Sequence, residues 1–571
     1  MNTLTIDGNG ETLTFLSTDT NERATLKLDQ TDYLTIINLR IVAAGGASGE
    51  YGFAVQLMNG ADFNTFTDCE FIADETSTLT NFTAFVTSNS PTGATTAGLA
   101  ASNLTVTGCL VSGGYYGMVI NGPTTAPFST GNVITNNDIV DFRLYGLYLR
   151  GQENGVFADN RIRRENRAEI STTYMIYFTS DMSGSTITNN ACYDFAGSAT
   201  STSTAHGIYG TSSASQQALL ISNNMVYGYE GMNGITYGAY FTTVDGVKFY
   251  HNSISLDNIG QTGSNLARAL FHSGTATIGV DIQNNIFSVN TGSSGIKYCL
   301  YFSTSAAVIS SNYNVLHMGS TNGTNHIGFA SSTSYTTLAD WQGAAGGLYD
   351  ANSVGDNPFF VPTTGVGIVP VNPSINGICP VLPEVPLDFA SVVRTVPTDP
   401  GALEFTGVSC LPPSGLTGLS STETTATIDW TENGAATEWQ IEYGPAGFAQ
   451  GSGSLIVTTN KPDTISGLVS STSYDFYVRS ICAPGDTSLW SVAPGNFLTS
   501  CGIFAYPFSN NFSGSGWVSG TGFDNVGDAI DACWSRDPGT GAPNYFWGTR
   551  TGGTGSGSTG PSSAFAGSNY L

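Results

Sequence analysis

A short motif that recurs along the first two thirds of the chain constrains the fold more than any other feature. Each copy alternates apolar and polar residues through a central pair that is usually rich in asparagine, as in VITNNDI (Val133 to Ile139). The last residue of each central pair serves as a marker, and the ten markers are Leu39, Cys69, Cys109, Asn137, Asn160, Asn190, Asn224, Asn252, Asn285 and Asn312. Successive markers lie 23 to 40 residues apart. A fixed local pattern with irregular spacing predicts short strands joined by loops of variable length.

Apolar residues stand three positions before each marker and usually two positions after it, as Ile134 and Ile139 do around Asn137. Coils of this size, stacked in parallel about 4.8 Å apart, predict a parallel β-helix with continuous inward columns. The crossover rule predicts that it is right-handed. We expect the marker asparagines to form a ladder at a turn, because their amides can bond to neighbouring coils and tolerate left-handed backbone. The alternative is an ordinary β-sandwich in which the asparagine pairs are coincidental.

Composition limits the partners and the compartment. The 571 residues leave room for two to four domains, and 43 acidic against 17 basic residues give a net charge of -26. No cationic surface is expected, so nucleic acid is not a predicted partner. The start, MNTLTIDGNG, lacks signal-peptide features, which taken literally predicts a cytosolic protein. Because the chain begins and ends in mid-pattern, we expect instead a fragment of an extracellular or cell-surface protein whose signal peptide and sorting region lie outside it.

The repeats resemble those of the pectate-lyase-like superfamily of right-handed parallel β-helices. The run TLADWQ to YDANSVGDNPFF (Thr337 to Phe360), followed by LDFASVVRTVPTDPGALEF (Leu387 to Phe405), is similar to the closing segment of many bacterial extracellular β-helix proteins. The resemblance implies a β-helix domain over residues 1–405.

The sequence pattern changes after Cys410. It predicts short strands of alternating polarity, with Trp430 in an early strand and SYDFYV as a later one. Residues 410–499 resemble a fibronectin type III domain. In that fold the start of the first strand and the end of the sixth lie at the same pole, which implies a disulfide between Cys410 and Cys482.

Residues 501–571 resemble the opening of a MAM domain, through Cys501, the pair Cys533-Trp534, Trp547 and the run Thr559-Gly560-Pro561. The resemblance covers about the first half of such a jelly-roll sandwich, makes Cys501 and Cys533 further disulfide candidates, and implies adhesion or recognition at a cell surface. The predicted fold is therefore all-β throughout.

A second strand recurs on each coil, as in YGLYL (Tyr145 to Leu149) and YMIYF. Its period of two predicts one inward column, namely Phe53, Met118, Leu147, Ile176, Ile208, Ala239, Leu270 and Leu300. The neighbouring outward column is Ala54, Val119, Tyr148, Tyr177, Tyr209, Tyr240, Phe271 and Tyr301. Flat aromatic faces repeated along a surface suit sugar rings, so the six aromatic residues are glycan-binding candidates. Two alternatives stay open: aromatic stacking between coils stabilises the strands, or a loop covers the row.

An enzyme is the rival interpretation, because many members of the superfamily cleave polysaccharides with clustered carboxylates, sometimes with Ca²⁺. Asp141, Arg164 and Asp194 follow three adjacent markers by four residues and are the candidate catalytic or cation-binding set. They fit a surface ion-pair ladder equally well. The basic run Arg161 to Arg167 is predicted either to face an acidic glycan or to form a solvated turn.

The remaining polar candidates have structural explanations. His272 falls in the inward column and is expected to be buried, while His206 and Arg268 replace tyrosine at one position of the second strand. Cys69 and Cys109 share a register, which predicts either a disulfide or a packed thiol column, unless a further coil lies in the 40 residues between them.

Three functions follow from these observations. The first is a secreted or surface-anchored protein that adheres to, or binds, an extracellular polysaccharide or cell-surface glycan, with the C-terminal modules as spacers or contacts for other surface proteins. The second is a polysaccharide lyase or glycoside hydrolase. The third is a structural stalk.

Overall fold

The computed structural model describes residues 3–168, 170–197, 200–274, 279–304, 308–344 and 347–502, together with 550–551 and 569–570. The chain divides into two compact units, Met1–Val408 and Ser409–Leu571. No helix in the described ranges is long and apolar enough to cross a membrane.

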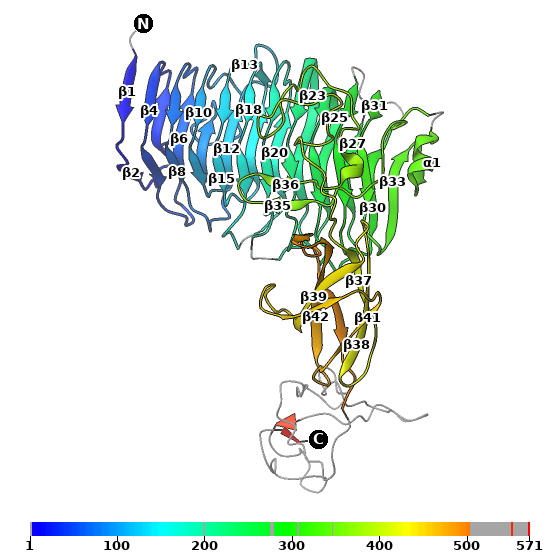
Figure 1. The fold of residues 1–571 in the computed structure, drawn as a ribbon. Coiled ribbons are helices and arrows are strands. Elements are labelled where there is room, and N and C mark those ends of the chain that lie inside the picture. The colour runs from blue at the N-terminus through cyan, green and yellow to red at the C-terminus, as the bar shows by residue number, and fades with distance from the viewer. Residues whose placement is uncertain are drawn as a thin grey trace, which may run out of the picture. The chain divides into compact units, whose positions relative to one another are not determined.

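The first unit is a parallel β-solenoid with three strand positions per coil, which form three faces (Figure 1). The first face precedes each marker and contains β1 (Leu4–Asp7), β4 (Leu34–Ile37), β7 (Thr65–Thr67), β10 (Thr105–Thr107), β14 (Val133–Thr135), β18 (Val156–Ala158), β21 (Thr186–Thr188), β28 (Val280–Gln283) and β31 (Ile309–Asn312). The second face follows each marker and contains β2 (Thr12–Phe15), β5 (Arg40–Ala43), β8 (Glu70–Ile72), β11 (Leu110–Ser112), β15 (Asp138–Val140), β19 (Arg161–Arg163), β22 (Ala191–Tyr193), β24 (Met225–Val226), β26 (Ser253–Leu256), β29 (Ile286–Val289) and β32 (Val315–Met318).

The third face contains β3 (Ala24–Asp29), β6 (Gly52–Met58), β9 (Phe82–Thr87), β12 (Tyr116–Asn121), β16 (Tyr145–Arg150), β20 (Thr173–Thr179), β27 (Ala267–Ser273), β30 (Ile296–Phe302) and β33 (Thr324–Ala330). Two longer strands, β23 (Ala205–Ser222) and β25 (Thr236–Tyr250), continue from the third face into the first face of the next coil. Short pairs are added by β13 (Ser129–Thr130) with β17 (Gln152–Glu153), and by β34 (Thr333–Tyr335), which lies antiparallel to β33. The predicted solenoid is confirmed, with one 11-stranded face among the described residues.

The marker asparagines form the expected ladder inside the solenoid. From Asn137 to Asn285 each side-chain amide donates to the Oδ1 of the next asparagine at 2.9 to 3.0 Å. The ladder continues through Asn314 and not through Asn312, because Gln283 pairs with Asn312 and places Asn285 opposite Asn314. The left-handed backbone falls one residue before each marker, as at Asn136 (φ 56°) and Asn189 (φ 56°), rather than at the marker itself.

Two further register predictions are corrected by strand pairing. Phe53 pairs with Thr83, and Thr83 with Tyr116, so Phe53 lies in an outward column, while Val55 takes the inward place and Ala54 is part of the core. A coil also precedes the first predicted marker, since β1 pairs with β4 over Leu4 to Asp7. Its Gly8-Asn9 turn replaces the asparagine pair, and for this reason the motif did not reveal it.

Cys69 and Cys109 lie on adjacent coils, because Thr65 pairs directly with Thr105, and no further coil lies between them. Both thiols are free and buried. The backbone N–H of Cys69 donates to the sulfur of Cys109 at 3.4 Å, so the pair continues the ladder position as a thiol column.

The C-terminal end of the solenoid is closed by the short helix α1 (Leu338–Gln342). Its Trp341 is fully buried, with its ring 5.0 Å from that of Tyr349 and 5.7 Å from that of Phe302. The indole N–H donates to Asp350 at 2.8 Å, which fixes the helix against the last coil.

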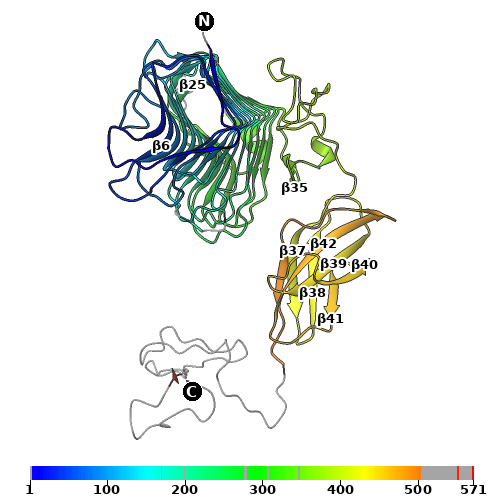
Figure 2. The ribbon, with the colours of Figure 1, turned by 90° about the vertical axis from the view of Figure 1, so that its left-hand side faces the viewer.

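Residues 356–405, here called the strap, return along the outside of the solenoid (Figure 2). The strap contains β35 (Val361–Thr363), β36 (Gly367–Val369) and a 3-10 turn (Pro373–Ile375). Its apolar side chains cover the second face, with Ile368 and Leu403 packed against Met225. The predicted closing segment is thus a lateral cover as well as an end cap.

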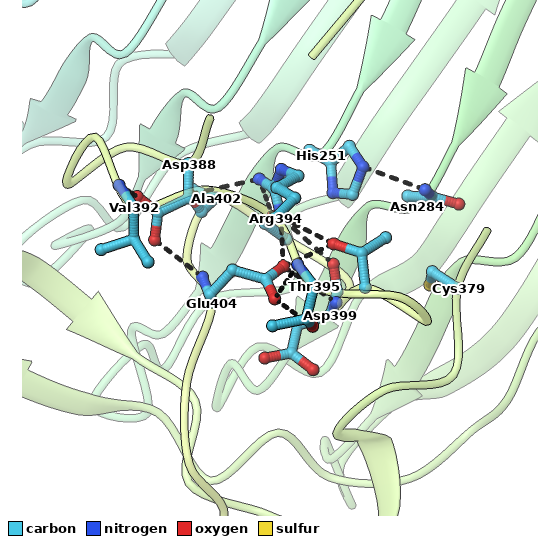
Figure 3. Close-up of polar contacts among 12 residues, drawn as sticks. His251, Asn284, Cys379, Asp388, Val392, Arg394, Thr395, Asp399, Ala402 and Glu404 are labelled. Carbon is cyan, nitrogen blue, oxygen red and sulfur yellow. Dashed lines mark hydrogen bonds and ion pairs between the residues drawn. The ribbon is translucent and has the colours of Figure 1, made fainter. Parts of the chain in front are cut away.

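A buried polar cluster shapes the strap (Figure 3). Arg394 is fully buried and pairs with Glu404 at 3.0 Å. Asp388 accepts from the backbone N–H groups of Val392 and Glu404, and Asp399 from that of Phe405. Because backbone donors and Arg394 occupy these carboxylates, the cluster organises the strap and is not a reactive site; we call it the strap knot.

The second unit, over the described residues 409–502, is a sandwich of two antiparallel sheets. Its strands are β37 (Ser414–Ser421), β38 (Thr425–Thr431), β39 (Glu438–Pro445), β40 (Ser454–Thr458), β41 (Asp463–Ser466), β42 (Ser473–Ala483), β43 (Asp486–Thr487) and β44 (Gly495–Leu498). Trp430, Trp439 and Phe476 pack between the sheets. Cys410 and Cys482 form the expected disulfide, with their Cα atoms 5.7 Å apart.

The MAM-like prediction for residues 501–571 falls almost entirely outside the described residues. Two short strands, β45 (Arg550–Thr551) and β46 (Asn569–Tyr570), pair in antiparallel fashion. Cys501 is disulfide-bonded, and Cys533 lies outside the described residues.

Candidate functional site

The third face carries two parallel columns of mostly aromatic residues, which we call the aromatic strip. Column one consists of Tyr116, Tyr145, Tyr174, His206, Tyr237, Arg268, Tyr298 and His326. Column two, which includes the six glycan-binding candidates, consists of Tyr148, Tyr177, Tyr209, Tyr240, Phe271, Tyr301 and Phe329. The strip therefore contains the predicted row and a second column beside it.

The two columns lie three residues apart on each strand because the chain bends inward between them. On β16, Tyr145 and Tyr148 both face outward, and their ring centroids are 5.2 Å apart. Gly146 packs closely against the neighbouring coils, since a Cβ there would lie 2.5 Å from Ile162 Cγ2 and 2.6 Å from the Met175 carbonyl oxygen. On β20 the same inward position is filled by the buried side chain of Met175. Glycine thus allows the close approach on β16, and the two columns persist where another residue takes its place.

The rings of column two stack on one another instead of offering flat faces to solvent. Tyr148 and Tyr177 are 5.0 Å apart with planes inclined by 6°, and Tyr177 and Tyr209 are 5.2 Å apart at 13°. From Tyr209 to Tyr301 the rings tilt by 60 to 67° against each other. The expectation of exposed ring faces is thus wrong for the parallel part of the column, because each face is already covered by the next coil's ring. Ring edges and hydroxyl groups remain for a ligand.

Column one is stacked in the same way, with His206 between two tyrosines. Its ring lies 4.4 Å from that of Tyr174 and 5.0 Å from that of Tyr237, nearly parallel to both. Burial lowers the pKa of His206 to about 3, so its imidazole is neutral.

Partly accessible residues occur along the whole strip, from Tyr116 and Tyr145 to His326 and Phe329, while His206, Tyr237 and Phe271 are buried. Tyr174, Tyr177, Tyr209 and Tyr240 are all half-buried, whereas Tyr148 is only 3% exposed. At the Tyr148 end, Arg150 lies over the Tyr148 ring and donates to the Thr95 carbonyl at 2.8 Å. At the other end the Tyr298 hydroxyl meets Ser334 of β34 at 3.0 Å. The loop cover considered as an alternative therefore touches both ends of the strip, and Tyr177, Tyr209 and Tyr240 stay partly accessible.

The electrostatics of the strip differ from those of the whole chain. In a protein of net charge -26, the strands from β12 to β33 on this face contain a single acidic residue, Asp245, which lies beyond the strip in β25. Burial raises the pKa values of Tyr177 and Tyr209 to about 12, so their hydroxyls stay protonated at neutral pH. The surface thus offers neutral donors and acceptors without repulsion of an acidic ligand.

Arg268 is the one arginine in the two columns, between Tyr237 and Tyr298. Its guanidinium carbon lies 4.1 Å from the ring centroid of Tyr301 and 4.5 Å from that of Phe271. No ion pair in the described part of the chain includes Arg268, and its Nε has no hydrogen-bond partner there. A guanidinium held on aromatic rings and without a carboxylate can bind an anionic group of a ligand.

The candidate set Asp141, Arg164 and Asp194 is stacked on adjacent coils, but its side chains do not converge. Asp141 is buried and accepts from the backbone N–H groups of Asn166 and Arg167 at 2.8 and 3.2 Å. The Arg164 guanidinium is buried against the Phe142 ring and donates to the Thr173 hydroxyl, and burial lowers its pKa to about 9. Asp194 is exposed. This arrangement holds the loop after β19 in place and offers no open pair of carboxylates.

The basic run Arg161 to Arg167 is split between surface and interior, so a solvated turn describes only part of it. Arg163 pairs with Asp138 at 2.8 Å. Arg167 is buried and donates to the carbonyls of Ser77, Gly114 and Asp141. His272 is fully buried, as expected for the inward column.

Comparison with known proteins agrees with a solenoid. The family model described as "Periplasmic copper-binding protein (NosD)" matches residues 63–289. No curated protein matches the chain in sequence.

Solved structures similar to the chain include the titin kinase with its flanking domains (20% identity, 16% of this chain and 17% of that chain, TM-score 0.14). Others are PfbA, a surface adhesin of Streptococcus pneumoniae (11% identity, 50% and 63%, TM-score 0.31), and the Azotobacter vinelandii mannuronan C-5 epimerase AlgE6 A-module (11% identity, 57% and 91%, TM-score 0.28). The matches with titin and PfbA thus span less than two thirds of those chains. The Cys410–Cys482 disulfide indicates an extracytoplasmic location.

Proposed function

We propose that this chain is a secreted or surface-exposed modular protein that binds an extended extracellular glycan along the aromatic strip. One observation carries the proposal: an accessible aromatic surface with a guanidinium and no carboxylates, on a protein that is otherwise strongly acidic. The sugar contacts ring edges and tyrosine hydroxyls, and an acidic glycan also contacts Arg268. The C-terminal sandwich, which we assign to the fibronectin type III class, and the MAM-like segment would act as spacers or contacts to other surface proteins.

The description of the matching family model suggests copper binding. The described residues of this chain do not fit a copper site. Copper sites use cysteine, methionine or histidine ligands. No group of three His, Cys, Asp or Glu in the described ranges is arranged to hold a metal ion. The thiol pair Cys69 and Cys109 already donates to the carbonyls of Thr67 and Thr107.

Affinity electrophoresis in gels that contain soluble neutral or acidic polysaccharides tests the proposal. The double variant Tyr177→Ala, Tyr209→Ala should lose retention by about tenfold or more, because it removes central contacts of the strip. The matched control is Tyr33→Ala, Phe63→Ala, a stacked pair 4.8 Å apart outside the strip. Equal retention of the two variants on every polysaccharide would refute glycan binding by the strip.

Arg268→Gln separates acidic from neutral ligands. It should weaken retention by acidic polysaccharides and leave retention by neutral ones unchanged, since only the former use the positive charge. A uniform change on all gels would show that Arg268 contributes packing rather than recognition of an anion.

A further inference from the structure

A second candidate site lies where the strap meets the solenoid. The residue before each marker forms a row of left-handed turns, which we call the turn row: Asn38, Asp68, Gly108, Asn136, Asp159, Asn189, Asn223, His251, Asn284 and Tyr313. The strap covers part of this row, since Asn223 donates to the Leu387 carbonyl at 2.9 Å and Asn284 to the Pro380 carbonyl at 2.8 Å. Next to the covered part the row opens into a cavity.

The cavity has a volume of about 260 Å³ and combines polar and apolar walls. The turn row supplies Asn136, Asp159 and Asn189, and the adjacent strand β19 supplies Arg161. The strap supplies Val366 and Phe389. The volume is below the roughly 300 to 1,000 Å³ of pockets for drug-sized ligands, so the occupant is a single small ring rather than an oligomer.

The polar groups of the cavity keep unused hydrogen-bonding capacity. Asn189 donates to Asp159 Oδ1 at 3.2 Å, but its own Oδ1 is buried and has no partner among the described residues. One N–H group of Arg161 donates to the Gly365 carbonyl at 2.8 Å. The exposed carboxylate of Asp159 and the other guanidinium N–H groups of Arg161 face the cavity and can bond to a ligand there.

We propose that this cavity binds one neutral sugar residue. The charges of Asp159 and Arg161 cancel, which favours a neutral ligand over an acid or an amine. Adjacent sugar hydroxyls both donate and accept, so they match the carboxylate of Asp159 and the guanidinium of Arg161. The apolar face of the ring lies on Val366 and Phe389. An extended peptide is less suitable, because strap residues 365–366 and 389–390 wall the cavity where such a chain would continue along the turn row.

Saturation-transfer NMR and titration of the whole protein with the methyl glycosides of glucose, galactose, mannose and N-acetylglucosamine test this site. At least one should bind with a Kd of about 10 mM or tighter. Asp159→Asn should weaken it about tenfold because it removes a charged acceptor, and Asn189→Gly should weaken it similarly because it removes the amide that holds Asp159. Both replacements suit the left-handed backbone. Asn38→Gly is the matched control, because Asn38 has the same backbone conformation (φ 54°) on the same row, outside the cavity.

The outcomes separate this site from the aromatic strip. The strip variant Tyr177→Ala, Tyr209→Ala should bind the glycoside as the wild type does. The proposal is overturned if no glycoside binds, if Asn189→Gly and Asn38→Gly bind equally well, or if the strip variant alone abolishes binding.

Discussion

The side-chain amide of Asn314 donates a 2.9 Å hydrogen bond to the carboxylate of Asp350. Every hydrogen bond between two amides of the ladder runs toward the C-terminal end of the solenoid, and Asn314 is its last member. Asp350 is 1% exposed and also accepts from the indole of Trp341 and the hydroxyl of Ser353. One carboxylate therefore ends a polarised chain of amides and fixes the capping helix, which makes the bonds mutually reinforcing.

Asp350→Asn should lower the free energy of unfolding by about 2 to 4 kcal/mol. The asparagine amide has an NH₂ group where Asp350 has an acceptor oxygen, and that group would face the buried donors of Asn314, Trp341 and Ser353. Asparagine tolerates the left-handed backbone of this position (φ 55°), so the backbone itself is not strained. Chemical denaturation measures the change. The control Asp356→Asn alters an exposed carboxylate that accepts from Ser374, and an equal loss there would contradict the special role of Asp350.

Arg394→Met should release the strap without unfolding the coils. It removes the 3.0 Å pair with Glu404 and the 2.7 Å bond to Asn223, leaving a buried carboxylate unpaired, at a cost of about 3 to 5 kcal/mol. Hydrogen exchange should rise about tenfold or more in residues 379–405 and stay slow in β25 and β26. Lys248→Met is the control, since it breaks the partly exposed pair with Glu384, worth about 0 to 1 kcal/mol. Equal exchange rates in Arg394→Met and Lys248→Met would contradict the role of the strap knot in holding the strap on the solenoid.

His206→Tyr should make the protein more resistant to acid. The pKa of His206 is about 3 in the fold, below the ordinary value, so only the unfolded chain takes up this proton as the pH falls below about 6.5. Stability from the neutral histidine is therefore lost as the pH falls, by about 1.4 kcal/mol per pH unit. Tyrosine continues the column between Tyr174 and Tyr237 and does not take up a proton. Denaturant unfolding of both proteins from pH 7 to pH 4 should diverge, and parallel curves would sink the prediction.

Raising the pH above about 10 should also lower the free energy of unfolding, through the tyrosines of the strip. The pKa values of Tyr177 and Tyr209 are raised to about 12, so between about pH 10 and pH 12 the unfolded chain loses these protons and the fold retains them. The free energy of unfolding should fall over this window. Tyr177→Phe, Tyr209→Phe keeps the ring stack and should flatten the fall, as measured by denaturant unfolding at each pH.

Local pattern predicted the solenoid well, because each coil repeats its own apolar spacing and its marker. The errors in register arose where the sequence of a coil can be aligned with the previous coil in two ways. SSNYN holds two asparagines, and only pairing with the previous coil selects Asn314 over Asn312. Likewise, Tyr51 resembles the other strand-opening tyrosines, yet Phe53 occupies their column.

The candidate sites were less predictable because they depend on distant parts of the chain. The outward direction of Tyr177 follows from strand period, but the stacking of its ring face on Tyr209 depends on rotamers that the sequence does not encode locally. The cavity needs the strap to fold back, and Arg394 meets Asn223 across 171 residues. No local pattern indicates such a contact.

The ladder also bears on how such a chain can change over generations. Its rungs stay at hydrogen-bonding distance although the connecting segments vary, with 23 residues between Asn137 and Asn160 and 34 between Asn190 and Asn224. Insertions and deletions between rungs therefore leave the interior register intact. Loops that border the aromatic strip and the cavity can diversify under selection for new ligands, while the inherited scaffold beneath them stays the same.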